Sequence, residues 1–146
     1  MSKNKIKVLF LCTGNSCRSQ IAEGWARHLK GDVIDAYSAG IRPLGVSSRA
    51  IKVMAEVGVD ISNHNSKHMG EFKGIDFDYV VTLCDNVSES CPVFTGKAKV
   101  IHKPFEDPYL STLDEENVIK AFRKVRDQIR VFVEEMPGNL CKEDAK

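Results

Sequence analysis

Residues 12–19 bring together the side chains that a nucleophilic reaction on an oxyanion would need. The segment reads Cys-Thr-Gly-Asn-Ser-Cys-Arg-Ser, with Cys12 at its start and Arg18 near its end. A thiolate is a strong nucleophile, and a guanidinium offers a planar fork of N–H donors to a tetrahedral oxyanion. The Ser19 hydroxyl can help to hold Cys12 as a thiolate. We therefore predict that Cys12 is a nucleophile, supported by Arg18 and Ser19.

The backbone of this segment can also bind the oxyanion. A loop that leads from a strand into a helix aims several N–H groups at one point, and the helix dipole adds positive potential there. Gly14 and Asn15 are residue types that tolerate the unusual backbone angles of such a loop. The predicted oxyanion-binding loop comprises Thr13, Gly14, Asn15, Ser16, Cys17 and Arg18.

Other interpretations of this segment are weaker. It lacks the G-x-x-x-x-G-K-[ST] pattern of a nucleotide-binding loop. Cys12 and Cys17 are too far apart for a Cys-x-x-Cys pair, and the chain has none, so no metal site is predicted. A flavin-binding loop and a purely structural turn remain alternatives, although a central cysteine and an arginine are unusual in the former.

The surrounding elements must place this loop at the edge of a sheet. Apolar runs predict strands, and apolar residues spaced three or four apart predict helices. We expect strands over 6–11, 33–38, 78–83 and 99–102, and helices over 20–30, 47–57 and 112–136. Thr112 and Glu115 have the spacing of a capping box for the last helix. The alternation predicts an α/β fold, a doubly wound four-stranded parallel sheet with helices on both faces.

In such sheets the ligand site lies at the carboxyl ends of the strands. Cys84 directly follows the third predicted strand, and Asp107 follows the fourth, so both are expected on the same rim as Cys12. A carboxylic acid at Asp107 could protonate a leaving oxygen. Its neighbour Glu106 is the less suitable acid, and an ordinary turn aspartate is the alternative for Asp107.

Length and composition limit the classes of protein to consider. The 146 residues predict a single domain over 1–146, with 138–146 as a flexible tail. The 21 Lys and Arg nearly balance the 20 Asp and Glu, so neither a nucleic-acid partner nor a membrane surface is indicated. No apolar run could span a bilayer, and no signal-peptide pattern appears. We expect a cytoplasmic protein, most simply a monomer, without a structural disulfide framework.

These motifs resemble the low-molecular-weight protein tyrosine phosphatase superfamily, one branch of which is the thioredoxin-coupled arsenate reductases. The loop at 12–19 looks like the signature loop of that superfamily. The likeness extends to Gln20–Trp25, Ser38–Gly40, Asp60–His64 and Val81–Cys84. It implies a phosphatase-like fold and, for the reductase branch, arsenate as substrate, thioredoxin as reductant and no bound cofactor.

The cysteines after the third strand favour the reductase branch. A phosphatase needs one cysteine, whereas Cys12, Cys84 and Cys91 together permit a relay of thiol–disulfide exchange. Cys12 would attack arsenate, Cys84 would attack Cys12, and Cys91 would attack Cys84. Burial without chemistry is the alternative for Cys84 and Cys91. Cys17 and Cys141 are expected to take no part.

Some positions depart from one branch or the other. Tyr109, after Asp107, resembles the phosphatases, which leaves a tyrosine phosphatase as the alternative function, but Gln20 stands where they usually carry proline. Some reductases bind a structural potassium ion, and the matching positions are Asn15, Glu23 and Ser38. Lys67 stands where a further carboxylate is expected, and its ammonium could replace the cation, so no potassium requirement is predicted. The histidines form no metal-ligand set, and His64 and His68 are interpreted as a polar surface pair.

Overall fold

The computed structural model describes residues 5–84, 96–108 and 114–140. Its elements are β1 (Ile6–Leu11), α1 (Arg18–Lys30), β2 (Ile34–Ala39), α2 (Ser48–Ala55), the 3-10 helix η1 (Met69–Phe72), β3 (Tyr79–Thr82), β4 (Lys99–His102) and α3 (Glu115–Glu134). The predictions for Cys91, Tyr109 and Cys141 fall outside the described residues.

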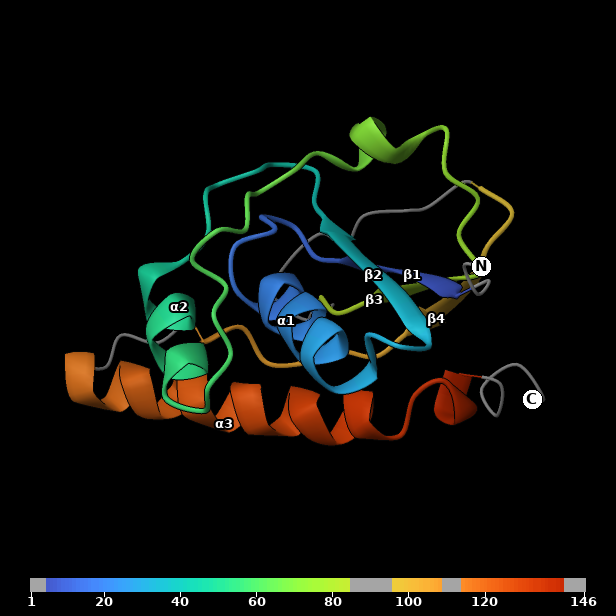
Figure 1. The fold of residues 1–146 in the computed structure, drawn as a ribbon. Coiled ribbons are helices and arrows are strands. Elements are labelled where there is room, and N and C mark those ends of the chain that lie inside the picture. The colour runs from blue at the N-terminus through green and yellow to red at the C-terminus, as the bar shows by residue number, and fades with distance from the viewer. Residues whose placement is uncertain (1–4, 85–95, 109–113, 141–146) are drawn as a thin grey trace.

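The four strands form one sheet in the order β2-β1-β3-β4, and every neighbouring pair is parallel (Figure 1). β1 lies between β2 and β3, and its residues from Val8 to Leu11 have no exposed surface. That burial on both faces explains why the sequence of β1 is a continuous apolar run rather than an alternating one. The loop that follows β1 therefore leaves the sheet at the centre of its carboxyl edge.

The two faces of the sheet are covered differently. One face carries a large core in which Val8 and Phe10 of β1 pack with side chains of α1, α2 and α3. On the other face, a smaller cluster joins Leu9 and Leu11 to Phe72 and Phe77 from the segment around η1. The predicted four-stranded parallel sheet is confirmed. Of the helices in the described part of the chain, α1, α2 and α3 cover one face and η1 lies on the other (Figure 1).

The last long helix begins later than the sequence suggested. Asp114 is its N-cap, and the Asp114 carboxylate accepts a hydrogen bond from the backbone N–H of Asn117 at 3.0 Å. Glu115 is thus the first helical residue, and the N-cap is Asp114 rather than the predicted Thr112, which lies outside the described residues. α3 packs one apolar face on α1 and α2. Among the described residues, no helix is long and apolar enough to cross a bilayer.

The packed part of the chain continues beyond α3. Met136 and Leu140 are buried in the main core, with 2% and 0% of their surfaces exposed. The Asn139 side-chain amide donates to the carbonyl oxygen of Phe132 at 2.9 Å. The expected flexible tail from residue 138 therefore begins too early, because Leu140 still forms part of the core.

Candidate active site

Cys12 lies directly after β1 and is almost completely buried, with 2% of its surface exposed. Its Sγ lies 2.9 Å from the hydroxyl oxygen of Ser19, in the first turn of α1. The Asn15 side-chain amide donates to the same hydroxyl oxygen at 2.8 Å. That contact uses one lone pair of the Ser19 oxygen and leaves the hydroxyl proton able to donate to a thiolate at Cys12.

Arg18 is the first residue of α1, and only 3% of its surface is exposed. Its Nη1 donates to the carbonyl oxygens of Phe105 at 3.1 Å and Leu83 at 3.4 Å. Its Nη2 lies 3.6 Å from Oδ2 of Asp107. These contacts join the loop after β1 to the segments that follow β3 and β4. The predicted sharing of one rim by these three segments therefore holds for Arg18, Leu83 and Asp107.

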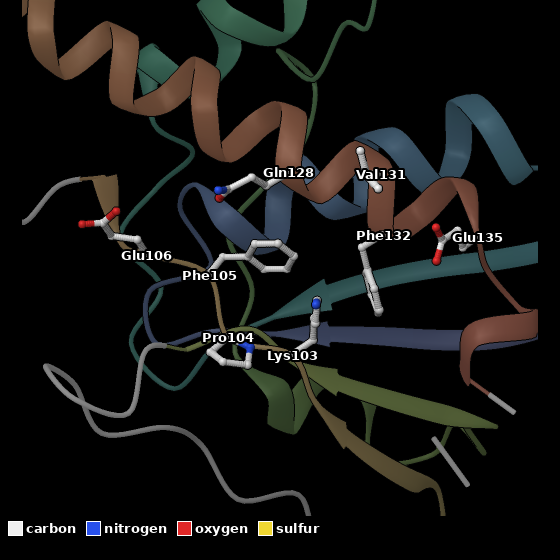
Figure 2. A pocket seen from close by; sticks show the side chains of 8 residues that line it. All are labelled: Lys103, Pro104, Phe105, Glu106, Gln128, Val131, Phe132 and Glu135. Carbon is white, nitrogen blue, oxygen red and sulfur yellow. The ribbon is translucent and has the colours of Figure 1, made fainter. Parts of the chain in front are cut away.

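Packing behind the segment 103–107 holds Asp107 toward Arg18. A groove of about 590 Å³ lies between α3 and this segment, and Figure 2 shows the side chains that line it. The Lys103 ammonium lies 5.8 Å from the ring centres of both Phe105 and Phe132, and Phe105 is buried. Glu106 lines this groove rather than the cysteine loop. Asp107 therefore lies against Arg18 whereas Glu106 lines the groove, and the role of Asp107 as an acid stays a prediction.

The loop owes its shape to Asn15, which adopts a left-handed backbone conformation with φ of 48°. Gly14 was expected to need unusual angles as well, but positive φ occurs here at Asn15 and not at Gly14. A left-handed conformation costs a residue other than glycine about 1–2 kcal/mol. The hydrogen bonds around the fully buried Asn15 offset that cost.

Two of those hydrogen bonds come from the Ser66 side chain and the Lys67 backbone, contacts that sequence reasoning missed. The Ser66 hydroxyl donates to the Asn15 carbonyl oxygen at 2.6 Å, and the Lys67 backbone N–H donates to Oδ1 of Asn15 at 2.8 Å. The local sequence does not predict these contacts, because one uses a small hydroxyl and the other a backbone N–H. Residues 65–68 therefore form a support for the loop that only the fold assembles.

Gly40, at the end of β2, completes this support. Its backbone N–H donates to the carbonyl oxygen of Lys67 at 2.9 Å. A Cβ atom at Gly40 would lie 2.6 Å from the carbonyl oxygen of Thr13 and 2.7 Å from that of Cys12. Both neighbours are backbone atoms of the oxyanion loop and cannot turn away. Glycine is thus required here for close approach of two backbones.

Cys84 is buried at the carboxyl end of β3. In the β1–β3 pairing, Leu11 is opposite Thr82, and the backbone N–H of Leu83 donates to the carbonyl oxygen of Leu11 at 2.8 Å. Cys12 is the first residue after β1, and Cys84 is the second residue after β3. Because β1 and β3 are parallel neighbours, both cysteines follow the carboxyl ends of adjacent strands on the same rim.

Cys17 belongs to the loop but differs from Cys12 in its environment. It is the N-cap residue of α1 and is buried. Burial raises the pKa of the Cys17 thiol well above its ordinary value, and the neighbouring Cys12 and Asp107 add to the rise. A thiol in this state is a poor nucleophile, so Cys17 contributes packing and backbone to the loop.

At the positions matching a potassium site, the Glu23 carboxylate already has hydrogen-bond partners. The Glu23 carboxylate accepts from the Ser38 hydroxyl at 2.5 Å and from Nε of Arg27 at 2.8 Å. Lys67 was the expected replacement for the cation, but its ammonium donates to the carbonyl oxygen of Asn65. Arg27 therefore supplies the positive charge beside Glu23. Among the described residues, no group of three or more His, Cys, Asp or Glu side chains could hold a metal ion.

The histidines also differ from expectation. His64 is half-buried, and its Nδ1 lies 2.9 Å from Oε1 of Gln20. His68 caps η1, where its Nδ1 accepts from the backbone N–H of Gly70 at 2.9 Å. His68 is exposed, as the predicted polar surface pair requires, but His64 is half-buried and the two rings have separate partners, so they do not form a pair.

This combination of a cysteine loop, an arginine at a helix start and an aspartate across the rim is matched by one family. The family model described as low molecular weight phosphotyrosine protein phosphatase matches residues 7–146. The chain belongs to this family. An arsenate reductase of Bacillus subtilis is 44% identical over 144 residues, which is 99% of this chain and 97% of the relative. The expected family and its phosphatase-like fold are thus confirmed.

Solved structures agree with that assignment. A structure described as an arsenate reductase in reduced state is 34% identical, has a TM-score of 0.72, and is matched over 92% of this chain and 98% of the other. A thioredoxin-dependent arsenate reductase of Corynebacterium glutamicum is 25% identical with a TM-score of 0.65, and is matched over 90% of this chain and 62% of its own. The family members most like this chain include enzymes named as arsenate reductases.

Proposed function

We propose that the protein reduces arsenate to arsenite through successive thiol–disulfide exchanges, with thioredoxin as the reductant. The observation that carries the proposal is the position of Cys84, buried at the end of β3 beside the strand that presents Cys12. A hydrolytic enzyme has no use for a second thiol at that position. The names of the relatives support the same substrate.

The first step forms a bond between sulfur and arsenic. The Cys12 thiolate attacks the arsenic atom of arsenate, which the loop N–H groups and the Arg18 guanidinium hold. An arsenic–oxygen bond breaks, and Asp107 donates a proton so that the oxygen departs as water. Arsenic is still pentavalent in the resulting thioester. Ser19 stabilises Cys12 before the attack through its hydrogen bond to the sulfur.

The second step transfers the electrons. The Cys84 thiolate attacks Sγ of Cys12, a disulfide forms, and the pair of electrons of the sulfur–arsenic bond remains on arsenic. Arsenic is reduced by two electrons and leaves as arsenite, while the two thiols are oxidised. Cys91 then attacks Cys84, which frees Cys12 and leaves a Cys84–Cys91 disulfide. Two electrons from the thioredoxin dithiol restore the enzyme.

A phosphatase activity is the second candidate. The family description and the position of Asp107, 3.6 Å from Arg18, both suit hydrolysis through a phosphorylated Cys12. Phosphate and arsenate have nearly the same shape and charge, so one loop can hold either. Hydrolysis requires Cys12, Arg18 and Asp107 but not Cys84. Replacement of Cys84 therefore separates the two functions.

The deciding experiment follows NADPH consumption with arsenate, thioredoxin and thioredoxin reductase. The wild type is compared with Cys84→Ser and Cys91→Ser, and Cys141→Ser is the matched control. We expect arsenate-dependent turnover in the wild type and the control, and none in the other two. Non-reducing peptide mapping after a single turnover without thioredoxin should recover the Cys84–Cys91 disulfide.

Each other outcome would count against a defined part of the proposal. No arsenate turnover in any protein, with aryl phosphate hydrolysis intact in all of them, would assign the chain to phosphatase function. Full turnover in Cys91→Ser would show that the reductant attacks Cys84 or Cys12 directly. Turnover with another dithiol protein but not with thioredoxin would replace the proposed partner.

A further inference from the structure

The buried side-chain amide of Gln20 is hydrogen-bonded at both its nitrogen and its oxygen. It lies in the first turn of α1 and has no exposed surface. Its Nε2 lies 3.0 Å from the carbonyl oxygen of Asn65, 3.2 Å from that of Asn15 and 3.1 Å from Oδ1 of Asn15. Three acceptors around one nitrogen fix the orientation of the amide, so Oε1 must point the other way.

The other end of the Gln20 amide meets His64. Oε1 of Gln20 lies 2.9 Å from Nδ1 of His64, and an amide oxygen can only accept, so Nδ1 carries the proton. Burial is the main cause that lowers the pKa of His64, and Arg27 and Lys67 lower it further. Glu23 and Asp60 act in the opposite direction but more weakly than burial. His64 is therefore neutral at pH 7, with its proton directed at Gln20.

The contacts from His64 to Cys12 form a chain of hydrogen bonds that leads to the sulfur. His64 donates to Gln20, Gln20 donates to Asn15, and Asn15 donates to Ser19. The Ser19 hydroxyl oxygen lies 2.9 Å from Sγ of Cys12, and its hydroxyl donates to the sulfur when Cys12 is a thiolate. Bonds aligned in this way polarise one another, so each donor is strengthened by the one behind it. The chain runs from a half-buried ring to the reacting atom.

We propose that Gln20 and His64 are positioning residues that hold Asn15 and orient the Ser19 hydroxyl toward the Cys12 thiolate. Neither residue touches the oxyanion or the sulfur. Without Gln20, the left-handed Asn15 would keep the hydrogen bonds from Ser66 and Lys67. Its two oxygens would lose the hydrogen bonds that the Gln20 amide donates. The inference rests on Cys12 being the nucleophile of the proposed function. It does not depend on arsenate being the substrate.

The test measures the reactivity of Cys12 directly. Each protein is treated with iodoacetamide between pH 5 and 9, and modification at Cys12 is quantified by peptide mass spectrometry. His64→Leu removes the donor to Gln20, and Gln20→Met removes the amide with little change in volume. We expect alkylation at neutral pH to slow by roughly threefold to tenfold in both, with the profile moved to higher pH.

Two further variants separate positioning from stability. His64→Asn presents an amide N–H in place of Nδ1–H and should restore the wild-type profile. His28→Leu removes an exposed histidine of α1 and should leave the profile unchanged. The charged groups nearest the loop, Arg18 and Asp107, are the same in every protein compared. A variant that loses only thermal stability would show the wild-type pH profile of Cys12 alkylation.

The proposal is overturned if His64→Leu, folded by circular dichroism, alkylates Cys12 with the wild-type pH profile. If Gln20→Met does not fold, the His64 pair alone decides the matter. Alkylation needs neither arsenate nor a reductant. If the variants shift the pH profile but the wild type does not turn over arsenate, this inference stands and the proposed function fails. If the wild type turns over arsenate but the variants keep the wild-type profile, the proposed function stands and this inference fails.

Discussion

Oδ2 of Asp107 lies 3.6 Å from Nη2 of Arg18, so the carboxylate that follows β4 faces the guanidinium that begins α1. The contact joins the segment after β4 to the loop that holds Cys12, so the proposed acid and the proposed ligand of the oxyanion share one edge of the site. In the proposed reaction, Arg18 holds the anion and Asp107 gives a proton to the departing oxygen.

The first prediction concerns Asp107 itself. Asp107→Asn should lower kcat for arsenate-dependent turnover by roughly 10²-fold, because the leaving oxygen would depart without a proton. KM for arsenate should change less, since Asp107 does not bind the ground-state anion. Glu106→Gln is the matched control and should keep its activity, because Glu106 lines the groove of Figure 2. Equal losses in both variants would contradict the assignment.

Arg18→Lys should be damaging although it keeps the charge. A lysine ammonium cannot contact the carbonyl oxygens of Leu83 and Phe105 and a tetrahedral oxyanion with one planar fork. We expect kcat/KM to fall by roughly 10²-fold or more. Steady-state kinetics with Arg130→Lys, a change on the exposed side of α3, provides the comparison. An Arg18→Lys enzyme with normal kcat/KM would show that charge alone is sufficient.

Gly40→Ala should disturb the oxyanion loop. The added Cβ would meet the carbonyl oxygens of Thr13 and Cys12 at 2.6 and 2.7 Å, so the loop must move. We expect the free energy of unfolding to fall by about 1–3 kcal/mol and activity to fall further. Urea unfolding and kinetics would measure both. At Gly74 a Cβ meets nothing within 4 Å, so Gly74→Ala should match the wild type.

The ion pairs of Glu56 predict that part of the free energy of unfolding is lost in acid. A hydrogen bond from Arg123 is the main cause that lowers the pKa of Glu56 to about 2, and Arg126 contributes further. Because the folded pKa lies below the unfolded value of 4.5, this stabilisation is complete above pH 4.5 and is lost as pH falls toward 2.

Glu56→Gln should accordingly reduce stability at pH 7 by no more than about 1 kcal/mol, because the pair is partly exposed. Near pH 2 the variant and the wild type should unfold at the same urea concentration. Glu106→Gln serves again as the control. If the difference in free energy of unfolding between Glu56→Gln and the wild type stays constant from pH 7 to pH 2, this linkage is ruled out.

The ion pair of Arg27 with Glu23 predicts how the enzyme responds to potassium. Exchange of KCl for NaCl at constant ionic strength should leave the turnover of the wild type unchanged, because Arg27 already neutralises the Glu23 carboxylate. Arg27→Gln removes that charge, and its turnover should then rise with potassium. Strong activation of the wild type by potassium would contradict both statements.

The sequence was sufficient for the strands and for the order of the site residues. β1 and β4 have the expected bounds, and the other strands differ by a residue or two. Burial on both faces gives parallel strands an apolar signature that needs no tertiary information. Cys12, Ser19 and Arg18 could likewise be recognised, because a strand, a short loop and a helix fix their relative positions locally.

Tertiary structure decided what supports that loop. Residues 65–68 and Gly40 contact it through backbone groups and a small hydroxyl, which leave no mark on sequence pattern. From the sequence, Gln20 was a departure from the phosphatase pattern and His64 was a surface residue. Only the fold shows that their side chains are in contact. The helices on one face and the buried Leu140 also follow from packing between distant segments. Local chemistry thus predicts that Cys12 is the nucleophile, whereas long-range contacts determine how the loop around Cys12 is held.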